Sequence, residues 1–560
     1  MKTIAISLLA FATLPTLAQT GQMDSMEQMN HPARQAGSGA PERLGAVNFS
    51  ISCASAVQAP FNRGVALLHD FWYEEAKPQF EAIAKADPGC AMAYWGVAMS
   101  DFHQIWNRPN EAAQKRGWEA MQKAQSLGAK TARERDYIAA LSDFFRPGKA
   151  EFPERIAAYS AAMGKLYAAY PDDVDAGAFY ALSLVAAAPP DDTSLIWNRK
   201  AMAVMTPLIA KYPDNPGLVH YTVHACDNPS MAADGLAAAD HYGEIAQSGP
   251  HAFHMPGHIY ARLGLWPQDI ASQLGSIAAS EEAAKRGESG IMDEPHSYDF
   301  LLYAYLQSGK DTLATSVLKQ DEAALKTIAS MPGMGAGYMA GMVSYYKSKL
   351  PVFYALEMRD WKSAAALEPP AGSPPEVATL SVWARAIAHG HLKQADAAVA
   401  DLDRYHGLMD EIRKGKNAYV AEGTSVKIEQ EEIVAWVHFA AAKQAGALEH
   451  MRAAADLQDK VGQGEVDIPA REMLADMLLE SHQPREALAE YEKALQLSPH
   501  RFNGLYHAGM AAEEAGDKAK AHQFYADLLK STSNGAESAR PELAHAKAFA
   551  SSQDLAASQQ

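Results

Sequence analysis

The sequence predicts an all-α protein in which helix–turn–helix units stack into a superhelix, an architecture known as an α-solenoid. Helix-forming residues dominate the chain after about residue 55, and apolar side chains recur at the i, i+3 and i+4 spacing of a helix face. No convincing β-hairpin signal interrupts this pattern. Related units also repeat with a 34-residue period. Because each unit buries its apolar face only against its neighbours, such a chain is expected to form an elongated stack.

The first 18 residues are typical of a cleaved signal peptide. Lys2 precedes an apolar stretch from Ile4 to Leu17, and small residues stand at the positions that signal peptidase reads before the expected cleavage after Ala18. That stretch is too short to span a bilayer comfortably, and no later run reaches 18 unbroken apolar residues. The sequence therefore predicts a mature protein without a transmembrane segment, in the periplasm or secreted.

Residues 19–54 are rich in Gln, Met, Ser and Gly and are predicted to form a flexible N-terminal extension. Cys53 and Cys90 bracket the first helix pair, and an oxidising compartment favours a disulfide between them. Cys226 is left over. An unpaired thiol is either reactive or, more commonly, buried and inert.

The repeated unit is clearest near the two ends of the array. Its marker residues are Gly64, Ala76, Phe80 and Pro88 in the first unit, Ala475, Ala487, Tyr491 and Pro499 near the C-terminus, and Gly509, Ala521 and Tyr525 in the copy that follows. This pattern resembles the tetratricopeptide-repeat (TPR) family. The resemblance implies that only small residues fit where two helices cross, that the aromatic residue fills the adjacent space, and that the stack has a concave binding surface.

The predicted array has two parts. An N-terminal array with a His-rich concave face covers residues 55–367, and a C-terminal array covers 379–548 before a tail at 549–560. The Pro- and Gly-rich segment 368–378 is predicted to link the two arrays. Within the first array, the stretches HYTVHACD and HAFHMPGHIYARLG resemble segments of uncharacterised bacterial exported TPR proteins.

The charge of the chain argues against one class of partner. The formal net charge is −18, and no cluster of Lys and Arg is long enough to form a basic stripe. Because nucleic-acid binding needs such a stripe, the sequence predicts no nucleic-acid partner. A protein or peptide is the expected partner of the repeat surface.

Histidines in the middle of the chain indicate a metal site. His220 and His224 lie one helical turn apart, and Asn215 and Pro216 are expected to begin their helix. A second stretch supplies more candidates, with Pro256 as the expected start of its helix. The predicted metal-binding residues are His220, His224, His254, His258, His296 and Asp299. Imidazole pairs with a nearby carboxylate suit a divalent transition metal such as zinc, copper or iron. Recognition of an anionic or aromatic ligand and a structural polar network are the alternatives for the same histidines.

A second candidate site combines histidines with large aromatic residues. The repeat register places His69 and His103 on the concave face, near several tryptophans. The candidate ligand-binding residues are His69, His103, Trp95, Trp106 and His251. The alternative is that these rings are core residues, which is the commoner fate of large aromatics at helical spacing.

No catalytic residue can be assigned, because the chain lacks the GxSxG, P-loop and dinucleotide-binding motifs. Two functional hypotheses follow. The first is an exported TPR scaffold that binds a protein, peptide or small ligand on a His-lined surface with a divalent metal site. The second is a metal-dependent enzyme or metal carrier that uses the same histidines.

Overall fold

The structure is a computed structural model of the 560-residue chain. It describes residues 42–558 except 106–107, 149, 190–191, 332–336, 416 and 534–537. Within these ranges every regular element is a helix, which confirms the predicted all-α fold of paired helices. None of the described helices is long and apolar enough to cross a membrane. The predicted signal peptide and the first part of the extension lie outside the described residues.

The helices belong to two compact units. Among the described residues, the N-terminal unit comprises 42–259 and 274–294, and the C-terminal unit comprises 260–273 and 295–558. This division differs from the predicted linker at 368–378. Helices α16 (Trp361–Ala365) and α17 (Pro375–His391), on either side of that segment, pack together within one hydrophobic core. Residues 368–374 are therefore a loop inside the C-terminal unit, and residues 375–378 form the first turn of α17.

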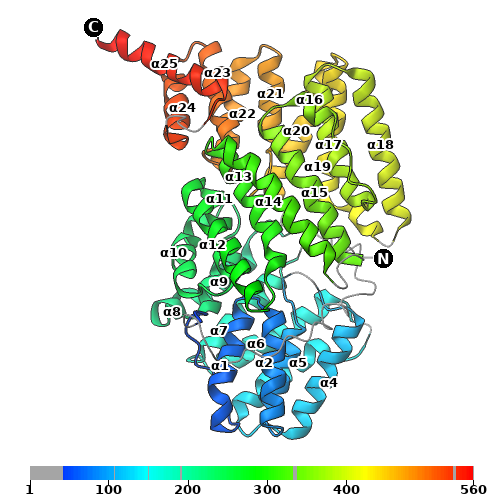
Figure 1. The fold of residues 1–560 in the computed structure, drawn as a ribbon, viewed down its shortest axis with the longest axis vertical. Coiled ribbons are helices and arrows are strands. Elements are labelled where there is room, and N and C mark those ends of the chain that lie inside the picture. The colour runs from blue at the N-terminus through cyan, green and yellow to red at the C-terminus, as the bar shows by residue number, and fades with distance from the viewer. Residues whose placement is uncertain are drawn as a thin grey trace. The chain divides into compact units, whose positions relative to one another are not determined.

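The N-terminal unit is built from consecutive helix pairs (Figure 1). Its helices are α1 (Gln58–His69), α2 (Tyr73–Ala86), α3 (Ala91–Ser100), α4 (Glu111–Leu127), α5 (Ala132–Phe145), α6 (Phe152–Ala169), α7 (Val174–Ala186), α8 (Ile196–Lys211), α9 (Pro216–Cys226) and α10 (Ala232–Ile245). Helices α11 (Pro250–Leu263) and α12 (Trp266–Lys285) contribute residues to both units.

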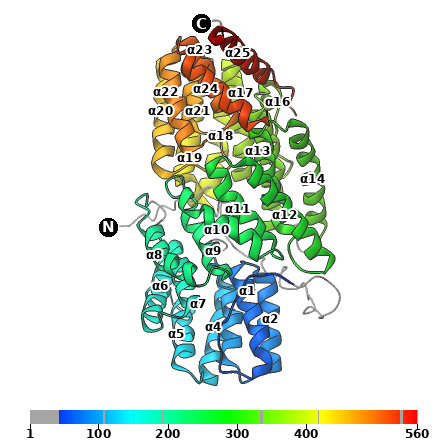
Figure 2. The same cartoon turned by 90° about the vertical axis from the view of Figure 1, so that its left-hand side faces the viewer.

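The C-terminal unit continues the same pattern. Its helices are α13 (Glu294–Gln307), α14 (Asp311–Ser330), α15 (Gly337–Glu357), α16, α17, α18 (Ala395–Lys414), α19 (Thr424–Ala440), α20 (Gln444–Val461), α21 (Ala470–Glu480), α22 (Pro484–Leu497), α23 (Phe502–Glu514), α24 (Lys518–Ser531) and α25 (Pro541–Ser558). The regular repeats α21 to α24 lie side by side in both views (Figures 1 and 2).

Small residues at the helix crossings explain why the pairs pack closely. A Cβ added at Gly64 would approach the Phe80 ring to 2.7 Å, and one at Gly509 would approach the Tyr525 ring to 2.4 Å. Both distances are below van der Waals contact, so a larger residue would force the helices apart. The predicted role of the small and aromatic repeat residues is confirmed at both ends of the array.

The described part of the N-terminal extension packs against the first helices, although the sequence predicts a flexible segment over 19–54. Phe49 is fully buried, and its ring packs against Phe61, Trp95 and Tyr137. Leu44 is also buried in the same core. An aromatic side chain inside the core fixes a segment that has little regular structure of its own.

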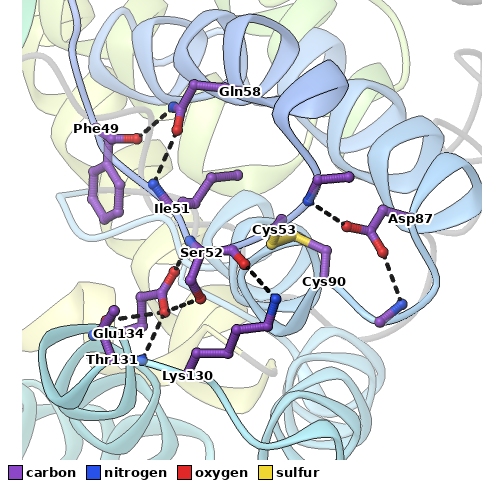
Figure 3. The surroundings of a disulfide bond; sticks show 12 residues. Phe49, Ile51, Ser52, Cys53, Gln58, Asp87, Cys90, Lys130, Thr131 and Glu134 are labelled. Atoms are coloured by element: carbon purple, nitrogen blue, oxygen red, sulfur yellow. Dashed lines mark hydrogen bonds between the residues drawn. A yellow bond between two sulfur atoms is a disulfide. The ribbon is translucent and has the colours of Figure 1, made fainter.

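Hydrogen bonds and a disulfide hold the end of this segment (Figure 3). The Ser52 backbone N–H and hydroxyl both donate to the carboxylate of Glu134, which also forms the capping box of α5 with Thr131. Cys53 and Cys90 form a disulfide, the pairing expected from the sequence. Cys226 is a free, buried cysteine.

Candidate metal centre

Helix α9 brings the first two histidines together. The Asn215 side chain accepts from the backbone N–H of Leu218, so it caps this helix as predicted. Because His220 and His224 are four residues apart, their rings share one face of α9, and their Nε2 atoms lie 3.1 Å apart. Two nitrogens on one tetrahedral ion, each about 2.0–2.1 Å from it, would lie about 3.3 Å apart. The pair is therefore spaced almost as one metal ion requires.

A backbone carbonyl sets the tautomer of His220. Its Nδ1 lies 2.6 Å from the carbonyl oxygen of His69, at the end of α1. A carbonyl oxygen can only accept, so Nδ1 carries the proton and Nε2 presents a lone pair toward His224. This outer hydrogen bond is the arrangement that orients histidine ligands in metal sites.

The His69 carbonyl is itself held in place by packing. The His69 ring is fully buried and contacts Tyr221 and Asp175, with nitrogen–oxygen distances of 2.9 and 3.0 Å. Gly217 makes room for this ring, because a Cβ there would come within 2.3 Å of His69 Nδ1. His69 thus acts as a buried support for His220.

Helix α11 supplies the third histidine of this group. The helix begins at Pro250, so the expected start at Pro256 is wrong, and Pro256 lies inside the helix. His251 therefore belongs to the first turn of α11. The candidate ligand atoms of His220, His224 and His251 all lie within 4.8 Å of one another. We call these three residues the tri-histidine cluster.

Phe71 covers the tri-histidine cluster from the turn between α1 and α2. Its ring centroid lies 4.5 Å from that of His220, 5.4 Å from that of His224 and 5.7 Å from that of His251. Phe71 has a φ of 56°, in the left-handed region that favours glycine. The corresponding turn after α11 uses Gly264 instead. The backbone at Phe71 thus adopts a costly conformation that places an aromatic ring against the histidines.

Burial keeps the three imidazoles neutral. The pKa of His220 is lowered well below its usual value, first by burial and then by the neighbouring His224. Burial is also the main cause that lowers the pKa values of His224 and His251, and the neighbouring histidines on α9 and α11 add to it. A neutral imidazole is the form that binds metal ions, so no proton has to be displaced from a charged ring near neutral pH.

A second histidine pair lies further along α11. The Nε2 atoms of His254 and His258 are 2.9 Å apart, and Nδ1 of His258 lies 2.9 Å from an Asp227 carboxylate oxygen. The sequence groups these residues with His220 and His224 as one site. The structure instead forms two pairs, one on each helix, with His251 placed beside the α9 pair.

The remaining predicted metal ligands lie in the C-terminal unit. The His296 ring packs edge-on against Phe300, with centroids 5.3 Å apart. Asp299 forms an ion pair with Lys349 at 2.5 Å, so its carboxylate has a cationic partner. Neither belongs to the tri-histidine cluster.

Of the predicted aromatic pocket residues, His251 belongs to the tri-histidine cluster and His69 supports it, whereas Trp95 and His103 are not members of it. Trp95 is buried in the core of the N-terminal unit, in agreement with the alternative core interpretation. His103 stacks on Tyr73 with centroids 4.2 Å apart and donates to the Ser100 carbonyl. Trp106 lies outside the described residues.

Two residues near the cluster are not evident from the sequence. Tyr242 stacks on His220 with ring centroids 4.9 Å apart, and its hydroxyl donates to Asp70 at 2.9 Å. Asp70 is fully buried, and burial raises its pKa well above the usual value. The sequence shows only that Asp70 stands at the turn after the first helix. How deeply its carboxyl group is buried depends on helices that are distant in sequence.

Comparisons with known proteins add no functional assignment. No protein-family model and no curated protein matches the chain. A solved structure of a human IFIT1 dimer with m7Gppp-AAAA has a TM-score of 0.36 and 10% identity, and the match covers 79% of this chain and 90% of that one. Yeast Tom70 has a TM-score of 0.30 and 13% identity, with coverage of 89% and 96%. At such TM-scores the likeness says nothing of ligand or partner.

Proposed function

We propose that this helical-repeat protein is a metal-binding scaffold that holds a divalent transition-metal ion between His220, His224 and His251. One observation carries the proposal: the Nε2 atoms of His220 and His224 lie 3.1 Å apart while Nδ1 of His220 donates to a fixed carbonyl. Three imidazole ligands on a four-coordinate ion leave one coordination position for water, a small ligand or a partner side chain. Zinc, copper and iron all suit such nitrogen ligands.

The compartment forms part of the same proposal. We infer that residues 1–18 direct export and that the mature chain works in the periplasm or outside the cell. The disulfide between Cys53 and Cys90 supports this inference, because such bonds persist in oxidising compartments. The repeat surface would then hold an exported protein or peptide partner beside the metal.

Metal content tests the proposal directly. The mature protein is purified without a metal-affinity tag, and its metal is measured by elemental analysis before and after refilling with Zn²⁺, Cu²⁺ or Fe²⁺. We expect at least one ion per chain, and we expect His220→Gln/His224→Gln to lose one ion.

The matched control is His438→Gln/His450→Gln in the C-terminal unit. These two rings are also neighbours, with centroids 5.2 Å apart, but the His450 ring contacts Glu431 at 2.6 Å. This variant is expected to keep the metal content of the parent. A parent chain that neither contains metal nor takes it up would refute the proposal, and so would equal metal content in all three proteins.

A further inference from the structure

The second histidine pair repeats the chemistry of the first. His254 and His258 lie one turn apart on α11 and are almost fully buried, and their Nε2 atoms are separated by 2.9 Å. A nitrogen–nitrogen separation near 3 Å again fits two ligands of one ion, because such ligands lie about 2.0–2.1 Å from the metal.

An outer partner fixes the tautomer here too. The Asp227 carboxylate follows α9 and lies 2.9 Å from Nδ1 of His258. Because an ionised carboxylate only accepts, Nδ1 of His258 carries the proton and its Nε2 lone pair points toward His254. A carboxylate behind a histidine also raises the basicity of the ligand nitrogen. Asp227 therefore has the same role for His258 that the His69 carbonyl has for His220.

The two groups of histidines are neighbours within the N-terminal unit. His251 and His254 lie on the same helix, and their ring centroids are 6.1 Å apart. The ring of His251 is also 5.1 Å from that of His220. A neutral imidazole has one N–H and one lone pair, so each histidine pair can share a proton between its two Nε2 atoms, and a bound ion would take the place of that proton.

We infer that His254 and His258, supported by Asp227, form a second metal site next to the tri-histidine cluster, so that the protein holds two ions. The inference rests on the proposed function. The second site has two histidine ligands in this unit where the first has three, so it is expected to fill after the first.

The test is a metal titration of the full-length mature chain, freed of metal by a chelator and refilled with Cu²⁺. Bound copper is counted by elemental analysis, and its electron spin signal is recorded at one and two equivalents. We expect two ions per chain in the parent. His254→Gln/His258→Gln should bind one, and His220→Gln/His224→Gln should lose the other. Asp227→Asn should weaken the second binding step by about 10-fold or more.

Spin coupling reports whether the two ions are neighbours. We expect a broadened, weakened copper signal in the parent at two equivalents and a normal single-ion signal in His254→Gln/His258→Gln. The control His241→Gln removes a half-buried histidine that pairs with Asp214 in the same unit. It should behave as the parent does, and circular dichroism should show that all variants are folded.

The outcomes separate the two proposals. One ion per chain, lost only when His220 and His224 are replaced, overturns the second site and leaves the proposed function standing. One ion lost in both double variants also overturns it, because both pairs would then share a single ion. No bound metal in any protein refutes the proposed function as well. Two ions without spin coupling overturn the adjacency of the sites.

Discussion

Two buried polar clusters, one in each unit, handle their charge in opposite ways. In the C-terminal unit, Arg501 lies between Glu357 and Glu472, with nitrogen–oxygen distances of 2.9 Å to each carboxylate, and all three side chains are almost fully buried. In the N-terminal unit, the tri-histidine cluster brings together three rings that are neutral at neutral pH. The first cluster contains its own counter-charges. The tri-histidine cluster consists of imidazole rings alone.

This difference separates a structural network from a ligand site. Arg501 has five donors, and carboxylates, the Tyr303 hydroxyl and the Asp467 carbonyl accept from them. Such a cluster is complete without any ligand. In the tri-histidine cluster the His220 lone pair faces Nε2 of His224, and a cation between the two rings would be bound by both nitrogens in place of the shared proton.

Removing the cation of the C-terminal cluster should have the largest effect. Arg501→Met leaves Glu357 and Glu472 buried without their partner, and we expect the free energy of unfolding to fall by about 3–5 kcal/mol. Urea unfolding of the whole chain, with hydrogen exchange of α21 and α23 as the local readout, measures this loss. Arg452→Met is the control. Its pair with Glu486 is exposed and 3.5 Å long, so the loss should stay below about 1 kcal/mol.

Bound metal at the tri-histidine cluster should raise the free energy of unfolding, whereas mutation of the cluster in metal-free protein should change it little. At a free metal concentration about 100 times the dissociation constant, metal binding should stabilise the parent by about 2.7 kcal/mol. In the metal-free protein, His224→Gln should change the free energy of unfolding by no more than about 1 kcal/mol, since no opposite charge is left unpaired. Thermal unfolding with and without Zn²⁺ measures both effects. A large loss in the metal-free variant would make the cluster a structural network like that of Arg501.

The buried side chain of His507 should make the stability of the C-terminal unit depend on pH, and this effect is smaller than the two above. Burial, with the charge of Arg359, lowers the pKa of His507 to about 4, against the raising effect of Asp476. Unfolded His507 binds a proton near pH 6.5, so between these values the unfolded state binds more protons and stability falls as pH falls. At pH 5 this loss is about 2 kcal/mol.

The variant His507→Gln isolates this contribution. Its free energy of unfolding should decline less than that of the parent between pH 7.5 and pH 5, by about 2 kcal/mol. Urea unfolding at each pH, on metal-free protein, provides the measurement. Equal pH slopes for parent and variant would show that His507 does not carry this effect.

Local sequence signals predicted the repeat packing and one histidine pair. The spacing of Gly64 and Phe80 is a property of a single helix pair, and so is the pairing of His220 with His224 on one helix face. Signals of this kind need no knowledge of distant contacts.

Long-range packing determined the rest of the site. Pro250 and Pro256 are both compatible with a helix start, and only the structure shows that α11 begins at the first of them. The His69 carbonyl that orients His220 belongs to the backbone, so no residue type identifies it. The separation of His254 and His258 from the α9 pair depends on how two helices cross. The boundary between the units likewise depends on contacts that composition does not reveal.

The buried segment that precedes α1 also determines where the chain can be truncated without exposing its core. Phe49 fills a gap between Phe61, Trp95 and Tyr137, and the disulfide ties the segment to the residue before α3. A repeat array needs a cap on its terminal pair, and here the cap is an irregular stretch of chain that secondary structure does not mark. A truncation made at the first helix, Gln58, would therefore leave an aromatic cavity open to water and yield a protein prone to aggregate.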